Sequence, residues 1–420
     1  MSERIRFFIN RLGERLWVKP LFMCILSVAG AFLAKSADYT MLGQYLPDVT
    51  AESVDTLLTI ISSSMLVIAT FAVASMVSAY ASASSTATPR SLPLVIADDV
   101  SQNALSAFIG AFIFSIVSII ALQNSFYDKA GRFTLFALTI VVFAIVILTF
   151  VRWVDRVARL GRLENTVDKV EAAATKALLQ RRRFPTMGGV PVAGRQAGST
   201  AIFSEHVGYV QRVDLKALQA YAEDKKLRIE LTALPGTFAA PGRSLAFAIG
   251  DTGEPADFDS DKIAGNFLIG DHRTYDEDPR FGFIALAEIA SRALSPAVND
   301  PGTAIDVIGT LVRLFTSWFE PLDESEKQKP KYDRVAVPEI STEDLLTDAF
   351  NPIARDGASV IEVVLRLQKA FNSLSSLNDS ELQELAKSHA GLALERAELA
   401  LDFAPDVQLA RNTASFATDR

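Results

Sequence analysis

Hydrophobic residues gather in four long runs in the N-terminal part of the chain, over residues 20–37, 56–83, 104–122 and 133–151. A helix needs about 20 apolar residues to cross the hydrocarbon core of a bilayer, and each run is close to that length or longer. The runs have no Asp, Glu, Arg or His in their interiors, and Lys35 lies near the end of the first. The pattern predicts four transmembrane helices. Because three further runs follow the first one, we expect it to be retained rather than cleaved as a signal peptide.

The second run is rich in Ala, Ser and Thr, unlike the other three. At about 1.5 Å per residue, a helix over residues 56–83 would extend about 42 Å, which is longer than the hydrocarbon core. Small residues allow close packing of helices in a membrane, and hydroxyl groups are also suited to line a pathway at an oligomer axis. Both interpretations stay open. The pore-lining candidates recur at helical spacing and are Ser75, Ser78, Ser82 and Ser85.

The distribution of Lys and Arg beside the runs predicts the orientation in the membrane. Five basic residues precede the first run, and four arginines follow the fourth run between residues 152 and 162. The loop between the first two runs has acidic residues instead. Since basic residues favour the cytoplasmic side, we expect both termini to be cytoplasmic.

The pattern changes after the membrane runs. We expect a helix over residues 152–183, a linker over 185–198, and a region of short strands and tight turns over 199–250. Strands are predicted at 200–203, 208–213, 227–234 and 244–249, with a short helix capped by Asp214. The sequence around Pro235-Gly236 and Pro241-Gly242 resembles the small β-barrel of biotinyl and lipoyl domains, but the lysine that is modified in those domains is missing here. This favours a structural barrel.

The remaining chain is mainly helical. Helices are predicted over residues 281–294, 302–319, 358–374 and 379–403, and the charged stretch 321–338 is expected to be a surface excursion. The expected fold class is an α-helical membrane domain followed by an α+β cytoplasmic domain with a β-barrel-like unit and a helical C-terminal half. The domains are an amphipathic arm (1–19), the membrane domain (20–154), a juxtamembrane helix and linker (155–198), the barrel-like unit (199–272) and the helical domain (273–420).

Composition narrows the possible functions. Half of the 420 residues are hydrophobic and the formal net charge is −8, which argues against a nucleic-acid-binding protein. The single cysteine, Cys24, excludes an internal disulfide and a zinc site built from cysteine pairs. His206, His272 and His389 are far apart in the sequence, and no nucleophile-elbow or phosphate-loop motif occurs. We therefore expect neither an enzyme nor a bound cofactor.

Two passages match a known pattern, and the first has two parts. These parts are Arg273 to Gly282 and Arg292 to Ala304, and the second passage is the serine-rich end of the second run leading into Thr88-Pro89-Arg90. With four leading spans, the chain resembles the bacterial predicted membrane proteins called domain of unknown function 2254. The resemblance implies this architecture and a bacterial inner membrane location, and it implies no particular activity.

The motifs suggest two further sites. The first is the loop with Ser295, Pro296, Asn299, Asp300 and Pro301. Either Asn299 or Asp300 is expected to cap the helix that follows this loop. Alternatively, the N-terminus of that helix could bind an anion, with Arg292 nearby. Asp276, Glu277 and Asp278 are weak candidates for a cation site. Acidic residues also stabilise the first turn of a helix by interacting with its dipole. Both interpretations of these acidic residues, stabilisation of the helix and binding of a cation, stay open.

The sequence as a whole suggests a homo-oligomeric, channel-like protein that conducts ions or small solutes, with a cytoplasmic domain that regulates or stabilises the pore. The alternative is a membrane-anchored regulator or scaffold whose cytoplasmic domain binds a partner. The expected partners are the lipid bilayer and further copies of the chain, with no nucleic acid. The sequence identifies no protein partner.

Overall fold

The computed structural model describes the chain except for residues 1–16, 41–44, 158–161, 195, 323–328 and 418–420 and the side chains of residues 85 and 86. The predicted N-terminal arm therefore lies almost entirely outside the described residues. The chain forms two compact units, Met1–Thr166 and Val167–Arg420, which we call unit 1 and unit 2. Each is described by itself.

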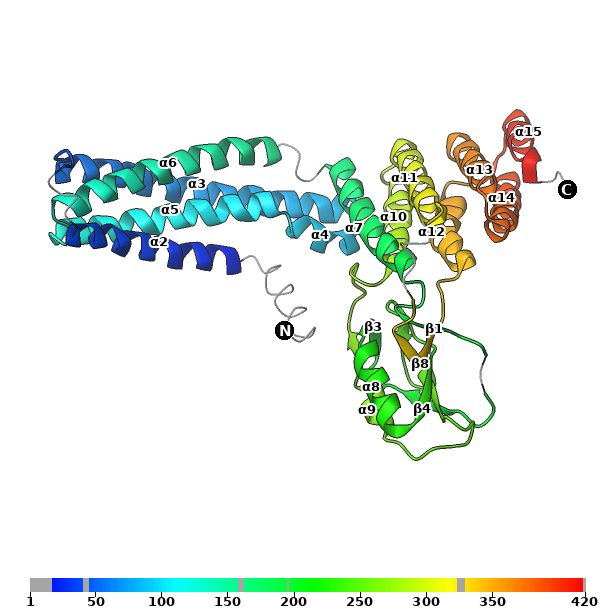
Figure 1. Ribbon diagram of the computed structural model, residues 1–420. Coiled ribbons are helices and arrows are strands. Elements are labelled where there is room, and N and C mark those ends of the chain that lie inside the picture. Colours follow the sequence, from blue (N-terminus) through cyan, green and yellow to red (C-terminus); the bar gives the residue numbers. More distant parts are fainter. Residues whose placement is uncertain (1–16, 41–44, 158–161, 195, 323–328, 418–420) are drawn as a thin grey trace. The chain divides into compact units, whose positions relative to one another are not determined.

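Four long helices run side by side in unit 1 (Figure 1). All four are long and apolar enough to cross a membrane, which confirms the four predicted spans. Three of the helices extend beyond their apolar runs at both ends, and α2 starts two residues before its run and ends one residue before the run does. The helices are α2 (Val18–Ser36), α3 (Ala51–Thr86), α5 (Asp99–Gln123) and α6 (Lys129–Val157).

Helix α5 packs against the other three long helices. Its buried side chains include Ala104, Ala107, Gly110 and Ala111, which are small enough to let neighbouring backbones approach closely. A Cβ added at Gly110 would lie 3.2 Å from the Cβ of Met23 in α2. The interior of unit 1 is thus filled by close helix packing.

A short segment, η1 (Ala37–Tyr39), closes one end of the unit. Its Asp38 carboxylate accepts hydrogen bonds from the backbone N–H groups of Asp128, at 2.9 Å, and Gly131, at 2.5 Å. These donors lie at the start of α6, so Asp38 caps a helix distant in sequence. At the other end, η3 (Pro89–Ser91) and α4 (Leu92–Ile96) connect α3 to α5.

The helix predicted over residues 152–183 is not continuous. Helix α6 ends at Val157, Arg162 is not helical, and a separate helix, α7, covers Leu163–Arg183. The predicted linker after it contains a short strand, β1 (Gly189–Pro191).

Unit 2 contains two open sheets. The five-stranded sheet has the order β1-β8-β4-β6-β2, with β8 parallel to both of its neighbours and β6 antiparallel to both of its own. The three-stranded antiparallel sheet has the order β5-β3-β7. The strands are β2 (Thr200–Phe203), β3 (Gly208–Val213), β4 (Leu227–Leu231), β5 (Phe238–Ala239), β6 (Ser244–Gly250), β7 (Phe267–Gly270) and β8 (Tyr332–Val337).

The predicted barrel-like unit over residues 199–272 is therefore wrong. Strand β8 comes from residues expected to form a surface excursion, and it lies between β1 and β4. Its Val335 and Val337 side chains are fully buried beside Ile229 of β4 and Leu218 of α8 (Leu215–Lys225). Two edge strands remain at the ends of this sheet, so it does not close.

The second half of unit 2 is helical, as predicted. Four buried phenylalanines, one each from α10 to α13, form a continuous aromatic core: Phe283, Phe315, Phe350 and Phe371, with successive ring centroids 5.0, 5.7 and 5.0 Å apart. The helices are α10 (Pro279–Ala293), α11 (Pro301–Phe319), α12 (Thr342–Asp356), α13 (Ile361–Ser375), α14 (Ser380–Ala400) and α15 (Ala404–Thr413), while α9 (Ser260–Ala264) belongs to the sheet region.

Candidate functional sites

The predicted pore-lining serines all lie in the last part of α3. Ser78 is exposed on the surface of unit 1, and Ser75 and Ser82 are half-buried. The Ser85 side chain lies outside the described residues. Of the row predicted from the sequence, the structure therefore places one hydroxyl fully on the outside of the helix bundle and two at its margin.

The exposed face of α3 changes along its length. Earlier in the helix it presents large apolar side chains such as Leu66 and Phe71, which are 54% and 62% exposed. Later, Ala74, Ser78 and Ala81 are exposed at helical spacing, beside two exposed valines. We call these three residues the small face of α3. By contrast, α6 exposes Val141, Phe143, Leu148 and Val151.

An ion pair with a buried carboxylate and a half-buried arginine lies where α5 begins and α6 ends. Arg156 donates to Asp98 Oδ1 from Nε at 3.0 Å and from Nη2 at 2.6 Å, and the Asp98 side chain is only 2% exposed. The other carboxylate oxygen accepts from Ser101, both from its backbone N–H, at 3.2 Å, and from its hydroxyl, at 2.8 Å. Sequence reasoning missed this pair because both residues flank apolar runs, and only the fold brings these flanks together.

The motif Thr88-Pro89-Arg90 forms the turn that leads into this region. The Thr88 hydroxyl accepts from the backbone N–H of Arg90 at 3.3 Å, and the Ser91 hydroxyl donates to the Thr88 carbonyl at 2.7 Å. Thr88 and Ser91 are both buried. This passage of the sequence pattern thus shapes the turn after α3.

The acidic run at residues 276–278 does not converge on one point. Asp276 is exposed, Glu277 lies 3.4 Å from Arg212 of β3, and Asp278 forms a two-point contact with Arg273 at 2.6 and 2.9 Å. Asp278 also caps α10 by accepting from the backbone N–H of Phe281 at 3.3 Å. Among the residues that the structure describes, no three His, Cys, Asp or Glu side chains are grouped so as to hold a metal ion.

Two further arginines, Arg181 and Arg280, connect the motif to other helices. Arg181 of α7 is 5% exposed and donates to the Glu277 carbonyl at 3.2 Å. Burial lowers the pKa of Arg181 to about 10, although Glu277 and Asp278 oppose this shift. Arg280 reaches α12 and pairs with Asp348 at 2.7 Å and with Asp344. The motif therefore joins α7, α10, α12 and the strand region of unit 2.

The loop between α10 and α11 folds onto itself. Its Asp300 caps α11, because its carboxylate accepts from the backbone N–H of Thr303 at 3.1 Å and from the Thr303 hydroxyl at 2.6 Å. These hydrogen bonds lower the pKa of Asp300. Asn299 has a φ of 51° and donates its N–H to the Ser295 carbonyl at 2.9 Å, while Pro296 is exposed and Pro301 begins α11. A carboxylate thus occupies the helix N-terminus that an anion would need.

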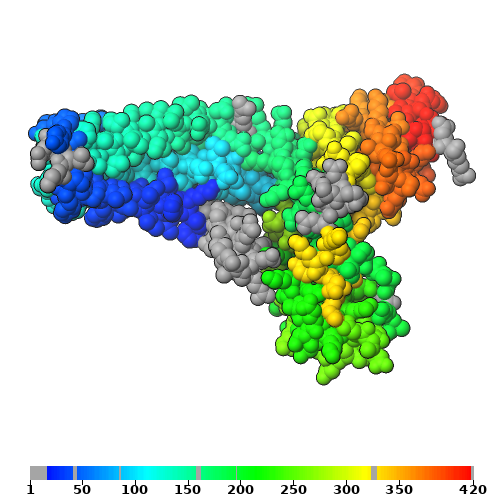
Figure 2. Space-filling model, in the orientation of Figure 1, coloured from blue at the N-terminus to red at the C-terminus, as the bar shows by residue number. Residues whose placement is uncertain are grey.

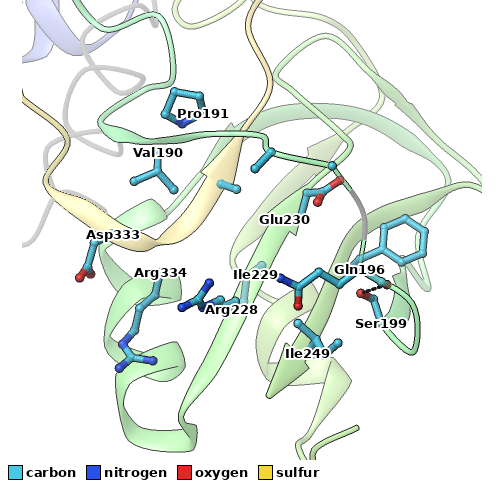
Figure 3. Close-up of a pocket in the computed structure, with 14 residues that line it drawn as sticks. Val190, Pro191, Gln196, Ser199, Arg228, Ile229, Glu230, Ile249, Asp333 and Arg334 are labelled. Atoms are coloured by element: carbon cyan, nitrogen blue, oxygen red, sulfur yellow. Dashed lines mark hydrogen bonds between the residues drawn. The ribbon is translucent and has the colours of Figure 1, made fainter. Parts of the chain in front are cut away.

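A cavity of about 140 Å³ lies on the five-stranded sheet (Figure 3). Its floor combines Arg228 and Glu230 of β4 with Phe247 and Ile249 of β6, and Arg334 and Ala336 of β8 extend it. The segment after β1 contributes Gln196 and Ser199 to the wall. The sequence predicts strand β4, but it does not indicate which residues lie over the face of this strand that carries Arg228 and Glu230.

Comparisons with known proteins place the chain among membrane proteins. The model of a family described as "Predicted membrane protein (DUF2254)" matches residues 13–373. Two relatives are the uncharacterized protein MT1328 of Mycobacterium tuberculosis and the uncharacterized protein Mb1321c of Mycobacterium bovis, both 33% identical over 115 residues. Each alignment covers 27% of this chain and 22% of the relative, so only about a fifth of the relative is matched. No solved structure matches the chain.

Proposed function

We propose a membrane function from the premise that this chain belongs to the DUF2254 family of predicted membrane proteins, as the match over residues 13–373 establishes. In this proposal the chain forms a homo-oligomeric, channel-like assembly in the bacterial inner membrane, with both termini in the cytoplasm. The assembly conducts ions or small solutes, and unit 2 regulates or stabilises it.

The small face of α3 is the observation that carries the proposal. Large apolar side chains suit contact with lipid, whereas small ones allow helices of neighbouring subunits to approach closely. The interior of unit 1 is filled by the packing around α5, so a pathway formed by several copies accounts for the small face better than one inside a single copy. The hydroxyl of Ser78 would then face the axis of the oligomer.

Ion flux through the purified protein in liposomes tests this proposal. We expect flux in the unmodified protein and at least a tenfold loss in Ser78→Phe, with the oligomeric mass in detergent unchanged. The matched control is Val141→Phe, which adds the same side chain at an exposed position of α6 and should keep the flux. Flux that survives Ser78→Phe, or no flux from a folded oligomer under any ion gradient, would reject the channel.

A scaffold is the second candidate, and an apolar patch on unit 2 favours it. Leu392 and Leu399 of α14, Phe403, and Leu409 of α15 are 49%, 90%, 63% and 46% exposed. Figure 2 shows these C-terminal helices, coloured orange to red, at the molecular surface. The patch lies after residue 373, where the match to the family model ends. A partner bound at the patch would therefore be specific to this chain rather than common to the family.

Site-specific photocrosslinking in cells distinguishes the scaffold. A crosslinker at Leu399 should capture one discrete protein, and the same group at the exposed Glu384 of α14 should not. Equal or absent capture at both positions would count against a partner at this patch. Neither candidate function includes a catalytic step.

A further inference from the structure

The chain connection between β1 and β2 explains why the cavity on the five-stranded sheet exists. These two strands are the opposite edges of the sheet, so residues 192–199 must cross the three strands between them. Four strand spacings amount to roughly 19 Å, whereas eight residues reach about 12 Å as a helix and about 26–29 Å when extended. A helix is too short for this crossing, and the part of the segment that the structure describes includes a turn in which the N–H of Ser199 donates to the Gln196 carbonyl at 3.3 Å.

A single short chain segment cannot fill the whole sheet face beneath it. Helix α8 packs against β4 and β8, where Leu227, Ile229 and Leu231 of β4 are buried with Leu218 of α8. Strand residues alternate between the two faces, so Arg228 and Glu230 lie on the opposite face, below the crossing segment. Among the described residues of this segment, Ala193, Gly194, Gln196 and Ser199 line the cavity. Ala193 and Gly194 are too small to fill the space above the strands.

The strand register sets apolar neighbours beside each charge in the cavity. Arg228 pairs with Ile249 of β6, and Glu230 pairs with Phe247 on one side and Ala336 on the other. As alternate residues of one strand, Arg228 and Glu230 have Cα atoms roughly 7 Å apart. The floor therefore presents a cation and an anion a short distance apart above an apolar surface.

The other charged groups that the structure describes at the cavity, Arg334 and Asp333, have partners within the protein. Arg334 donates to both carboxylate oxygens of Asp251 at 2.6 Å, and this arginine lowers the pKa of Asp251. Asp333 accepts from Gln219 at 2.6 Å. Arg228 has a longer contact, 3.9 Å from its Nε to Asp251, and its side chain is 63% exposed. Of the two arginines described at the cavity, Arg228 is therefore the one better placed to receive a ligand.

We propose that this cavity binds a small zwitterion of the amino-acid class, with its carboxylate on Arg228 and its ammonium group on Glu230. The volume exceeds what a single water needs and lies below the about 300–1,000 Å³ of sites for drug-sized ligands. A simple anion would meet the repulsion of Glu230, and a simple cation that of Arg228. An apolar side chain of the ligand would lie on Phe247 and Ile249.

Saturation-transfer NMR on the full chain in detergent tests this site with the twenty common L-amino acids, one at a time. We expect at least one to bind, and its desamino and descarboxy analogues to bind at least tenfold more weakly. Arg228→Gln and Glu230→Gln should each weaken binding tenfold or more. Lys262→Gln, at an exposed position of α9, is the matched control and should bind normally.

Each other outcome rejects the proposal. If no amino acid gives a signal that Arg228→Gln removes, the cavity is not such a site. If Glu230→Gln leaves binding unchanged, the ligand is a simple anion and the zwitterion class is wrong. Circular dichroism checks that the variants fold, which we expect because both side chains lie outside the core. Binding is measured without ion flux, so this test stands apart from that of the channel.

Discussion

Replacing Asp278 provides the sharpest test of how the acidic motif works. Its side chain is 3% exposed and forms a two-point contact with Arg273, and it also caps α10. Removing one partner of a buried ion pair costs about 3–5 kcal/mol, and a lost helix cap about 1 kcal/mol, with some overlap between the two effects. We expect Asp278→Ala to lower the free energy of unfolding of unit 2 by about 4 kcal/mol.

This loss converts into a measurable shift of the melting temperature. For domains of 150–250 residues, each kcal/mol corresponds to about 2–4 °C, so Asp278→Ala should lower Tm by roughly 8–16 °C. Asp278→Asn keeps an oxygen for the cap and should lose about half as much. Differential scanning fluorimetry of the full chain gives the shift, and hydrogen–deuterium exchange of α10 peptides assigns it to unit 2.

The control is Asp276→Ala, which changes the exposed neighbour in the same acidic run and should shift Tm by no more than about 2 °C. Equal shifts for the two variants would refute the reasoning. Millimolar calcium or magnesium that raises Tm by several degrees, through a site that needs Asp278, would refute it as well, because the carboxylate would then be a cation ligand.

Three further predictions concern the glycines and a buried histidine. Gly282→Ala should destabilise unit 2 by about 1–3 kcal/mol because the added Cβ would overlap Ala174 of α7. Gly391→Ala has open space around it and should stabilise α14 by up to about 1 kcal/mol. Shifts of the same sign in the thermal unfolding of the two variants would contradict this. Gly131→Ala would place a Cβ 2.5 Å from a carboxylate oxygen of Asp38, so backbone exchange in the first turn of α6 should accelerate about tenfold, and unchanged exchange would count against the cap. Burial lowers the pKa of His389, so the unfolded chain takes up the proton first as the pH falls. Unit 2 should therefore lose stability below about pH 6.5. His389→Leu should remove that part of the pH dependence of Tm, and an unchanged pH profile in this variant would exclude His389 as the cause.

The predictable parts of the fold are those whose signal is local. The four spans followed from apolar run length, and α8 followed from the Asp214 cap and the spacing of Leu215 and Leu218, which are both buried. Strands β2 and β3 were predicted at their observed bounds. In each case the residues that specify the element are the residues that form it.

Strand β8 shows where local reasoning fails. Its six residues follow a charged, proline-bearing stretch, and their alternation is too short to stand out. The strand exists because β1 and β4 supply hydrogen-bond partners on both sides, and both of these strands lie more than a hundred residues earlier in the chain. The barrel prediction failed for the same reason, since it considered only neighbouring segments.

The sequence alone determined that this protein has four membrane helices followed by an α+β region, because apolar run length and residue periodicity are properties of contiguous segments. Only the tertiary structure decided which charges meet. It joined Asp98 to Arg156 across two helix ends and Arg280 of α10 to Asp348 of α12. It also placed Arg228 and Glu230 in a cavity beneath the connection that crosses the sheet. These pairings depend on how distant segments pack.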